Sequence, residues 1–503
     1  MTRLVCVAVM CSAAIAWANG RPPATSTITF RQNDPQHVVA GMTFGIVMSP
    51  DGGHTWAWIC EAAVPYSGIF DPSFLDEPGG DIFATTLQGL EVTRDGCAFT
   101  PVPVAKGTCD GPKIDPCYDK VFFSNLVAGS GSAIYATASS PYDSKIYRSG
   151  DGGHTFAMLS SPGASDEYWQ SLVIAPSNSK RFYLAGYRFA KHCDAHSTNA
   201  GSDCVMNSSC GGSGTGSAMP KCTTVKLLQM FRSDDAGATW SALAQDGVQA
   251  SPESAISIIG VDPRDANQIY IRVSLESGGG GDGVYKSRDG GAAWTKIFDA
   301  RDPRGLAVLV RSTGELVAAT ESSGAFSSPG GAGCTDQASC AWKPLASAPH
   351  ITCLTEQPTT HDVWACTRDA SDDRAGIMKT SDLARWSPVL RYADIAAPVA
   401  CGSDTPLTRQ CVAPSQSMPS PWCCLKDQLG ITANPIACTG AYACTQAEPT
   451  KKPAPAPAVA KPKAGCCDAG GDPSGALLVG ALTLLLSRAN RSRRRPCRSP
   501  SRG

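Results

Sequence analysis

One short pattern recurs along this chain and limits what the chain can fold into. Its complete form is Ser-x-Asp-x-Gly, a variable pair and an aromatic residue, as in Ser49 to Trp56. Further copies occupy residues 149–156, 233–240 and 287–294, and shortened copies occupy 93–99 and 380–386. A motif that returns at intervals of several tens of residues predicts a repetitive architecture of stacked or radial units.

Each copy has the composition of a tight turn between two strands. Asp followed by Gly-Gly, as in Asp51-Gly52-Gly53, favours a turn because the carboxylate accepts backbone N–H bonds and glycine tolerates positive φ. Strand-like residues precede the turn, and an aromatic residue such as Trp56 opens the next apolar run. The pattern therefore predicts a β-hairpin whose aromatic residue packs between neighbouring sheets.

The spacing of the motif predicts the number of units. The interval between Asp289 and Asp382 is nearly twice most of the others, and it contains a degenerate copy at 325–331 in which Pro329 replaces the acid. Each copy follows further strand-like runs, which gives four strands per unit and seven units. We therefore predict an all-β fold, a seven-bladed β-propeller over about residues 27–392, with a Cys-containing surface-loop insertion at 190–223.

The motif residues resemble the Asp-box, or BNR repeat, S-x-D-x-G-x-T-W, of sialidases, sortilin-type receptors, glucan hydrolases and photosystem assembly factors. The resemblance implies that each box is the turn between the third and fourth strands of a blade, away from the active centre. A carboxylate satisfied by its own turn is a poor acid or base. The box acids expected to have this structural role are Asp51, Asp95, Asp151, Asp235, Asp289 and Asp382.

The sequence favours a binding protein over an enzyme. A sialidase-like site would need an arginine triad and an opening F/Y-R-I-P motif, and Phe30-Arg31 matches only the first half of that motif. No acid and nucleophile can be paired from the sequence. We expect a binding module for a protein or a glycan, with a glycoside hydrolase of sialidase-like or glucan-hydrolase-like type as the alternative. Three converging arginines at the channel mouth would indicate a sialidase, and an aromatic groove a glycan binder.

Charge argues against nucleic acid as a partner. The formal net charge is −1. Residues 466–503 hold seven Arg and two Asp, so the remainder of the chain is acidic and lacks the basic balance that nucleic-acid binding needs. No residue pattern calls for a cofactor.

The 23 cysteines indicate an exported protein with disulfides. Local spacing predicts the pairs Cys60–Cys97, Cys109–Cys117, Cys334–Cys340 and Cys353–Cys366. Pairing within the sets at 193–222 and 401–444 stays open, and residues 393–446 are expected to form a small Cys-rich module. A zinc site using His192, Cys193, Asp194, His196 and Cys204 is the alternative for the first set, although no CxxC pair occurs there.

Both termini have the form of targeting segments. Arg3, an apolar run and small residues ending at Ala18 predict a signal peptide over residues 1–18. Residues 447–464 form a Pro/Ala/Lys linker. Residues 465–503 follow, with Cys466, Cys467, a hydrophobic segment at 475–487 and an Arg cluster.

This C-terminal tail resembles the MYXO-CTERM sorting tail of myxobacterial surface proteins. The resemblance implies processing near Cys466 or Cys467 and delivery to the cell surface. The alternative is a permanent membrane anchor through a short transmembrane helix, although the apolar run is shorter than the roughly 20 residues that span a bilayer. Either way, we expect contact with a membrane through the tail.

Overall fold

The computed structural model describes residues 21–444 apart from several segments. The segments outside the described residues are 67–70, 88, 105–120, 140–143, 165, 194–202, 206–221, 252, 275–281, 301–305, 321–322, 370–372, 416–418 and 434. The chain divides into two compact units, Met1–Thr445 and Gln446–Gly503, and all described residues belong to the first.

The described residues form seven β-sheets, each with four consecutive antiparallel main strands, as the repeat predicts. We call these sheets blades 1 to 7. Blade 1 contains β1 (Thr25–Arg31), β2 (Asp34–Met42), β3 (Gly45–Ser49) and β4 (Ala57–Ile59); blade 2 contains β5 (Phe74–Asp76), β6 (Ile82–Thr86), β7 (Gly89–Thr93) and β8 (Thr100–Pro101). Blade 3 contains β9 (Phe123–Ala128), β10 (Ile134–Ala138), β11 (Ile146–Ser149) and β12 (Ala157–Ser160). Blade 4 contains β13 (Tyr168–Ala175), β14 (Asn178–Cys193), β16 (Cys222–Ser233) and β17 (Ser241–Ala242), with β15 (Asp203–Val205) beside β14. Blade 5 contains β18 (Ala255–Val261), β19 (Ile269–Ser274), β20 (Gly283–Ser287) and β21 (Thr295–Asp299). Blade 6 contains β22 (Ala307–Val310), β23 (Leu316–Thr320), β24 (Gly324–Ser328) and β25 (Lys343–Leu345); blade 7 contains β26 (Cys353–Glu356), β27 (Val363–Cys366), β28 (Ile377–Thr380) and β29 (Ser387–Leu390).

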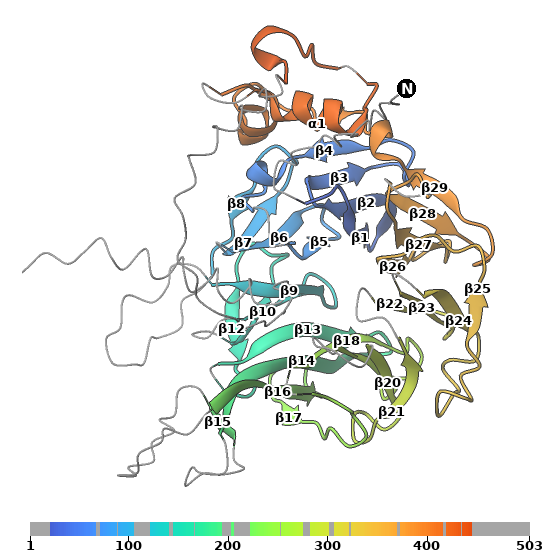
Figure 1. Cartoon of the computed structure of the whole chain (residues 1–503). Coiled ribbons are helices and arrows are strands. Elements are labelled where there is room, and N and C mark those ends of the chain that lie inside the picture. Colours follow the sequence, from blue (N-terminus) through green and yellow to red (C-terminus); the bar gives the residue numbers. More distant parts are fainter. Residues whose placement is uncertain are drawn as a thin grey trace, which may run out of the picture. The chain divides into compact units, whose positions relative to one another are not determined.

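The first strand of each blade contacts the first strand of the next, and β26 of blade 7 contacts β1 of blade 1. These contacts close a ring in which the first strands lie innermost (Figure 1). The structure is therefore a seven-bladed β-propeller, which confirms the predicted fold of this region.

The core lies between the blades. The second strands of blades 2, 3, 6 and 7 are buried at every position, because each middle strand is covered by a neighbouring blade on both faces. This burial explains why such strands carry apolar or small residues at successive positions, as in IYATA of β10, instead of alternating polar and apolar residues. Separate apolar clusters, such as the one around Tyr183, Ile271 and Tyr285, join adjacent blades.

The insertion in blade 4 differs from the expected surface loop. Strand β14 continues to Cys193 and pairs with β16 from Phe182 to Cys193, and β15 pairs with residues 190–192. The alternating residues around Tyr187 and Phe189 favour a strand, and the two arms of the insertion therefore extend the blade as a hairpin. The side chains of the alternative zinc ligands lie outside the described residues.

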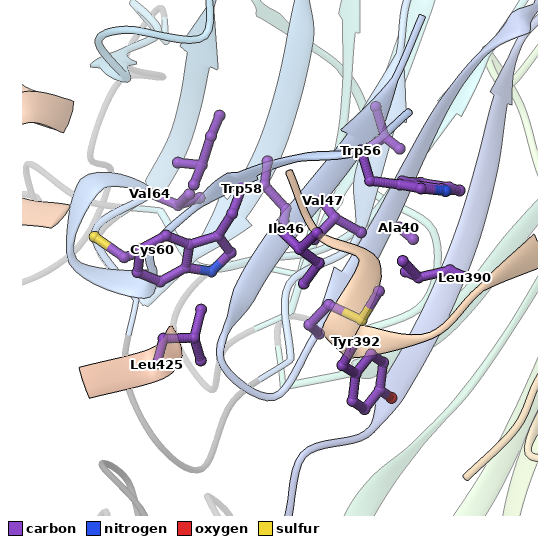
Figure 2. Packing of buried hydrophobic residues seen from close by; sticks show 14 of the residues in the cluster. Ala40, Ile46, Val47, Trp56, Trp58, Cys60, Val64, Leu390, Tyr392 and Leu425 are labelled. Carbon is purple, nitrogen blue, oxygen red and sulfur yellow. The ribbon is translucent and has the colours of Figure 1, made fainter. Parts of the chain in front are cut away.

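The residues after blade 7 fold back onto blade 1. They form η2 (Tyr392–Asp394), β30 (Ala397–Pro398), the π-helix η3 (Thr408–Val412), helix α1 (Pro421–Leu429) and η4 (Gly440–Tyr442). One further short helix, η1 (Glu61–Ala63), lies between blades 1 and 2. β30 adds a parallel fifth strand beside β4. Helix α1 begins after Ser420, whose side chain accepts a hydrogen bond from the amide of Cys423. The ring of Trp422 on this helix packs against Trp58 of blade 1, with the two ring centroids 5.8 Å apart. Figure 2 shows Leu425 of the same helix close to Trp58 and Cys60.

Two disulfides fasten these C-terminal residues to the first two blades. Cys60 pairs with Cys411 and Cys97 pairs with Cys401, so the predicted pair Cys60–Cys97 is wrong. The prediction paired the two cysteines because they are close in the sequence, but the segment after blade 7 passes next to both of them and supplies their partners. In the same segment, the amide of Leu407 donates to the carbonyl of Cys97. We call β30, η3 and these two disulfides the C-terminal clamp.

The predicted pairs Cys334–Cys340 and Cys353–Cys366 are both present. Cys423 pairs with Cys438, and Cys424 with Cys444. Cys109, Cys117, Ala18, Cys466, Cys467 and the hydrophobic segment 475–487 lie outside the described residues. Within the described part of the chain, no helix has both the length and the apolar character to cross a membrane.

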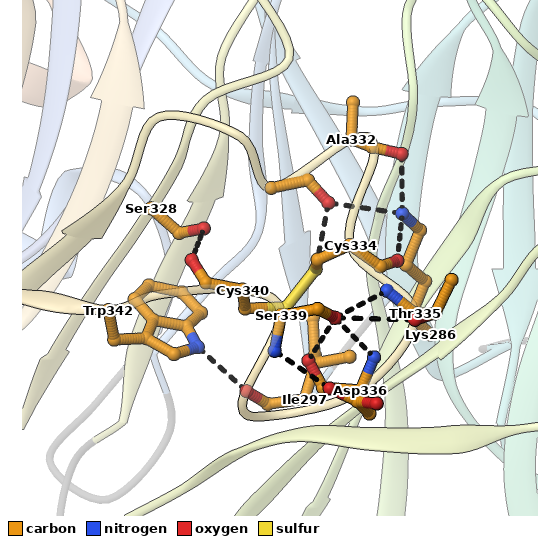
Figure 3. Close-up of a disulfide and its surroundings, with 11 residues drawn as sticks. Lys286, Ile297, Ser328, Ala332, Cys334, Thr335, Asp336, Ser339, Cys340 and Trp342 are labelled. Atoms are coloured by element: carbon orange, nitrogen blue, oxygen red, sulfur yellow. Dashed lines mark hydrogen bonds between the residues drawn. A yellow bond between two sulfur atoms is a disulfide. The ribbon is translucent and has the colours of Figure 1, made fainter.

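Blade 6 is held differently from the other blades at its third-to-fourth connection, where Pro329 replaces the acid. The ammonium group of Lys286, on β20 of blade 5, donates to the carbonyls of Gly331, Ala332 and Cys334 at 3.0, 2.6 and 3.1 Å (Figure 3). The Cys334–Cys340 disulfide closes the same segment. A neighbouring blade thus holds this segment through its carbonyl groups, whereas the acid of a complete motif holds its turn by accepting bonds from amides.

Candidate functional site

The six motif acids all lie in turns between the third and fourth strands of their blades. In blade 1 the Asp51 carboxylate accepts hydrogen bonds from the amide of Thr55 at 2.8 Å, the hydroxyl of Thr55 at 2.7 Å and the hydroxyl of Ser49 at 2.8 Å. These bonds, the Thr55 amide first, lower the pKa of Asp51 to about 2. The acid is therefore ionised and fully engaged within its turn, which suits a structural role and not proton transfer.

These turns share one face of the propeller with the first-to-second strand connections. The amide of Gly52 donates to the carbonyl of Gln36, and the amide of Gly152 to the carbonyl of Ser132. We call this the turn face. The opposite face, which we call the loop face, carries the second-to-third connections and the links between blades.

Two arginines at the turn-face ends of inner strands bind acids instead of converging on a ligand. Arg31 of blade 1 donates from Nε to Asp76 of blade 2 at 2.9 Å, and Arg311 of blade 6 donates from Nε to Glu356 of blade 7 at 3.1 Å. Both arginines link adjacent blades through equivalent positions. They do not form the arginine triad that would indicate a sialidase.

The loop face carries a cluster of three aromatic rings on blade 4, which sequence reasoning missed. Tyr168 stacks on Tyr187 with centroids 5.4 Å apart, and Phe189 meets both rings edge-on at 5.1 and 5.3 Å. All three side chains are partly exposed, and the Nζ atom of Lys226 lies 4.8 Å from the centroid of Tyr187. The alternation Tyr187-x-Phe189 on an extended strand was the available signal, but Tyr168 and Lys226 come from other strands.

A cleft of about 250 Å³ opens at the junction of blades 4 and 5. Tyr285 forms one wall, and its hydroxyl lies 3.3 Å from both the backbone N and O of Gln249. Lys296 lies with its Nζ 5.6 Å from the ring centroid of Tyr285. The lining residues are Gln249, Ala250, Ser251, Val273, Gly283, Tyr285 and Lys296.

This cleft and the aromatic cluster belong to the same junction. Tyr285 of blade 5 and Tyr187 of blade 4 pack on one apolar cluster between the two blades. A second cleft, of about 410 Å³, lies at the junction of blades 6 and 7 and is lined by Ser347, Ala348, Pro349, Asp373, Met378, Ala384, Arg385 and Trp386. The blade 4–5 junction combines aromatic rings, cations and a concave surface, and it is the stronger candidate site.

Two acids on the loop face have a pKa raised by burial, but they do not form a pair. Glu167 precedes β13, and the amide of Ala164 donates to it at 3.2 Å. Asp369 follows β27 of blade 7, and blades 5 and 6 separate it from Glu167. A glycosidase needs two carboxyl groups within roughly 10 Å of each other. Among the described residues, no group of three or more His, Cys, Asp or Glu is arranged to hold a metal ion.

No family model and no curated protein matches the chain. Among solved structures, the chain is similar to the extracellular domain of a putative one-component system from B. thetaiotaomicron, with 10% identity, 71% of this chain and 38% of that chain covered, and a TM-score of 0.43. It is also similar to a GH74 xyloglucanase from Xanthomonas campestris, with 13% identity, 72% of this chain and 64% of that chain covered, and a TM-score of 0.31. A third similar structure is a puromycin-hydrolyzing peptidase from Mycobacterium tuberculosis, with 11% identity, 73% of this chain and 53% of that chain covered, and a TM-score of 0.41. The chain spans less than two thirds of the length of each.

Proposed function

We propose that this protein is an exported binding module that recognises a glycan at the blade 4–5 junction of the loop face. The observation that carries the proposal is the partly exposed cluster of Tyr168, Tyr187 and Phe189 beside a small cleft. Aromatic rings offer broad apolar faces, and the hydroxyls of tyrosine add polar contacts, which together suit a sugar ring. A protein partner would need about 800 Å² of its own surface at the interface, and a concave site of this size favours the smaller ligand.

Export and surface attachment are part of the same proposal. Six disulfides among the described residues support an oxidising compartment. We infer cleavage after Ala18 from the signal-peptide pattern, a stalk at 447–464 from its Pro/Ala/Lys composition, and surface attachment through Cys466 or Cys467 from the MYXO-CTERM resemblance. The propeller would then stand away from the membrane and present the blade 4–5 junction to ligands.

A glycoside hydrolase is the second candidate, and Glu167 is the observation that favours it. Burial raises the pKa of Glu167, as a general acid requires. The adjacent acid, Asp166, is also buried, and its charge contributes to the raised pKa of Glu167, so it is the candidate partner carboxyl group. Release of new reducing ends by the wild-type protein, lost in Glu167→Gln, would establish the hydrolase instead.

The binding proposal is tested by applying the full-length protein to a panel of immobilised polysaccharides. We expect retention on at least one glycan, reduced about tenfold or more by Phe189→Ala and by Tyr168→Ala. The matched control is Met158→Ala, an exposed apolar residue on the outer strand of blade 3. The proposal fails if no glycan retains the wild-type protein, or if the two aromatic variants bind as well as Met158→Ala.

A further inference from the structure

The larger cleft, of about 410 Å³ at the junction of blades 6 and 7, is open to solvent. All of its lining residues are partly or fully exposed. Arg385 and Trp386 line it from the β28–β29 turn, and Asp373 lines it from the β27–β28 connection at the other end of β28. Because β28 has four residues, these two ends are about 13 Å apart, and the cleft follows the hairpin of blade 7.

The motif of blade 7 differs from the complete motif at the cleft. In blade 1 the hydroxyl of Thr55, just before the aromatic residue, donates to the carboxylate of Asp51 at 2.7 Å. In blade 7 the corresponding residue is Arg385, whose Nε and Nη2 atoms each donate to Oδ2 of Asp382 at 3.1 Å. A threonine is enough to close such a turn. The arginine closes it and also places at the cleft a side chain that is 90% exposed.

Trp386 lacks the hydrogen bond that other motif tryptophans make within their turns. The indole N–H of Trp56 donates to the carbonyl of Gly53, and that of Trp240 donates to the carbonyl of Gly237. The shortened turn of blade 7 contains no glycine, and the indole nitrogen of Trp386 has no hydrogen-bond partner in the part of the chain that the structure describes. Its ring packs against the apolar residues between blades 6 and 7 and also lines the cleft, which therefore has an aromatic wall.

The polar groups of the cleft are fixed by neighbouring residues and favour neither sign of charge. Arg385 pairs with Asp382, and Asp373 accepts a bond from the amide of His350 at 3.0 Å, with Nδ1 of His350 3.3 Å from the same oxygen. The exposed guanidinium of Arg385 opposes a cationic ligand, and the carboxylate of Asp373 opposes an anionic one. An uncharged ligand with several hydroxyl groups can bond to both.

We infer that the blade 6–7 cleft binds a neutral oligosaccharide. A sugar ring would lie against Trp386 and Met378, while its hydroxyl groups accept from Arg385 and donate to Asp373. The volume of about 410 Å³ falls within the roughly 300–1,000 Å³ of small-molecule sites. This site is separate from the aromatic cluster of blade 4 and goes beyond the proposed function: the propeller would hold polysaccharide at two places.

The test is calorimetry of the full-length protein carrying Phe189→Ala, so that the aromatic cluster of blade 4 contributes little. The probes are tetrasaccharides of β-linked glucose, mannose and xylose, with a galacturonate tetramer as the acidic comparison. We expect at least one neutral tetramer to bind, with an affinity that changes less than about twofold with salt. Adding Arg385→Thr, which restores the residue of the complete motif, should weaken binding about fivefold. Adding Ser347→Trp, at an exposed lining position, should abolish it.

The matched control is Arg391→Thr, because Arg391 also pairs with an acid three residues away but is not a lining residue. It should leave the affinity unchanged. Thermal melting identifies any variant that fails to fold, and if Ser347→Trp does so, the result for Arg385→Thr decides.

The remaining outcomes separate this inference from the proposed function. If no neutral tetramer binds, or if both cleft variants bind as tightly as their parent, the inference is wrong; a loss of binding caused by Phe189→Ala alone would leave the proposed function standing. If Ser347→Trp abolishes binding and Phe189→Ala has no effect, the cleft is the site and the proposed function is wrong. A preference for the galacturonate tetramer that disappears at high salt would overturn the neutral ligand class.

Discussion

The turns of blades 5 and 6 occupy equivalent places in neighbouring blades and are held in opposite ways. In blade 5 the bonds are local: Asp289 accepts from the amides of Ala292 and Ala293 at 2.9 and 3.1 Å. In blade 6, where Pro329 replaces the acid, the turn carbonyls accept from Lys286 on the preceding blade. A repeat can therefore lack the acid that binds its turn amides and still be held in place, here through its carbonyl groups by a donor from the adjacent blade.

The same replacement of local by distant contacts occurs where the ring closes. The four main strands of blades 1 and 7 are each consecutive in the sequence, and the short β30, which follows blade 7, joins β4 of blade 1 at its outer edge. The C-terminal clamp ties the chain after blade 7 to blade 1 through Cys60–Cys411 and to blade 2 through Cys97–Cys401. Bonds within a turn stabilise each repeat, and bonds over long sequence distances stabilise the points where the repeat fails or ends.

Removing the clamp disulfides tests the distant side of this comparison and should have the largest effect. Replacing Cys60, Cys97, Cys401 and Cys411 together by Ser opens loops with sequence separations of 351 and 304 residues. Because long loops gain the most entropy in the unfolded chain, we expect a loss of about 5 kcal/mol in the free energy of unfolding. Urea unfolding followed by tryptophan fluorescence measures it.

The control for the clamp variant is Cys353→Ser with Cys366→Ser. This pair joins directly opposed residues of β26 and β27 and has a sequence separation of 13. Its loss should cost about 3 kcal/mol. Equal losses in the two variants would show that the clamp adds nothing beyond an ordinary local disulfide.

Lys286→Met should have the next largest effect. Lys286 is buried and donates to three carbonyls of blade 6, and burial lowers its pKa to about 8. Methionine keeps much of the volume but leaves the carbonyls without this donor, which should cost about 3 kcal/mol. Lys379→Met is the matched control, since Lys379 has the same register in blade 7 and also lies over a ring. Lys379→Met should cost less than about 1 kcal/mol. Both variants are measured by urea unfolding, and similar midpoints for the two would contradict the stabilising role given to the bonds of Lys286.

The sequence was sufficient for the parts of the fold whose determinants lie close together in the chain. The turn around Asp51 is specified within eight residues, and the regular interval located even the degenerate copy at Pro329. The partners of Cys60 and Cys97 could not be read in this way, because they depend on where residues 393–412 fold back. The aromatic cluster was missed for the same reason: Tyr168, Tyr187 and Lys226 lie on three different strands and meet only after β13, β14 and β16 pair.

Asp51→Asn tests the local side of the comparison through its dependence on pH. The folded-state pKa of Asp51 is lowered to about 2 from an ordinary value of 3.8. Its ionised form therefore contributes stability that is present above about pH 4 and is lost as the pH falls towards 2. We expect Asp51→Asn to cost about 1 kcal/mol at pH 6 and nothing below about pH 2. Melting temperatures of both proteins across this range measure the difference, and a difference independent of pH would contradict the role given to the charge.

Ala236→Gly should have the smallest effect, and it should stabilise the protein. Ala236 has φ of +60° at the turn position where Gly52, Gly152 and Gly290 have +69°, +70° and +75°. An L-residue with a side chain is strained in this region, so glycine should add about 0.5–1 kcal/mol despite its larger unfolded-state entropy. Leu383, with φ of +59°, provides the control because its side chain is buried beside Val317 and Val363. Leu383→Gly relieves the same strain but removes apolar packing, and it should cost about 2 kcal/mol or more. A melting temperature that rises for Ala236→Gly and falls for Leu383→Gly separates backbone strain from side-chain packing within one turn motif; a fall in both would show that the positive φ costs nothing here.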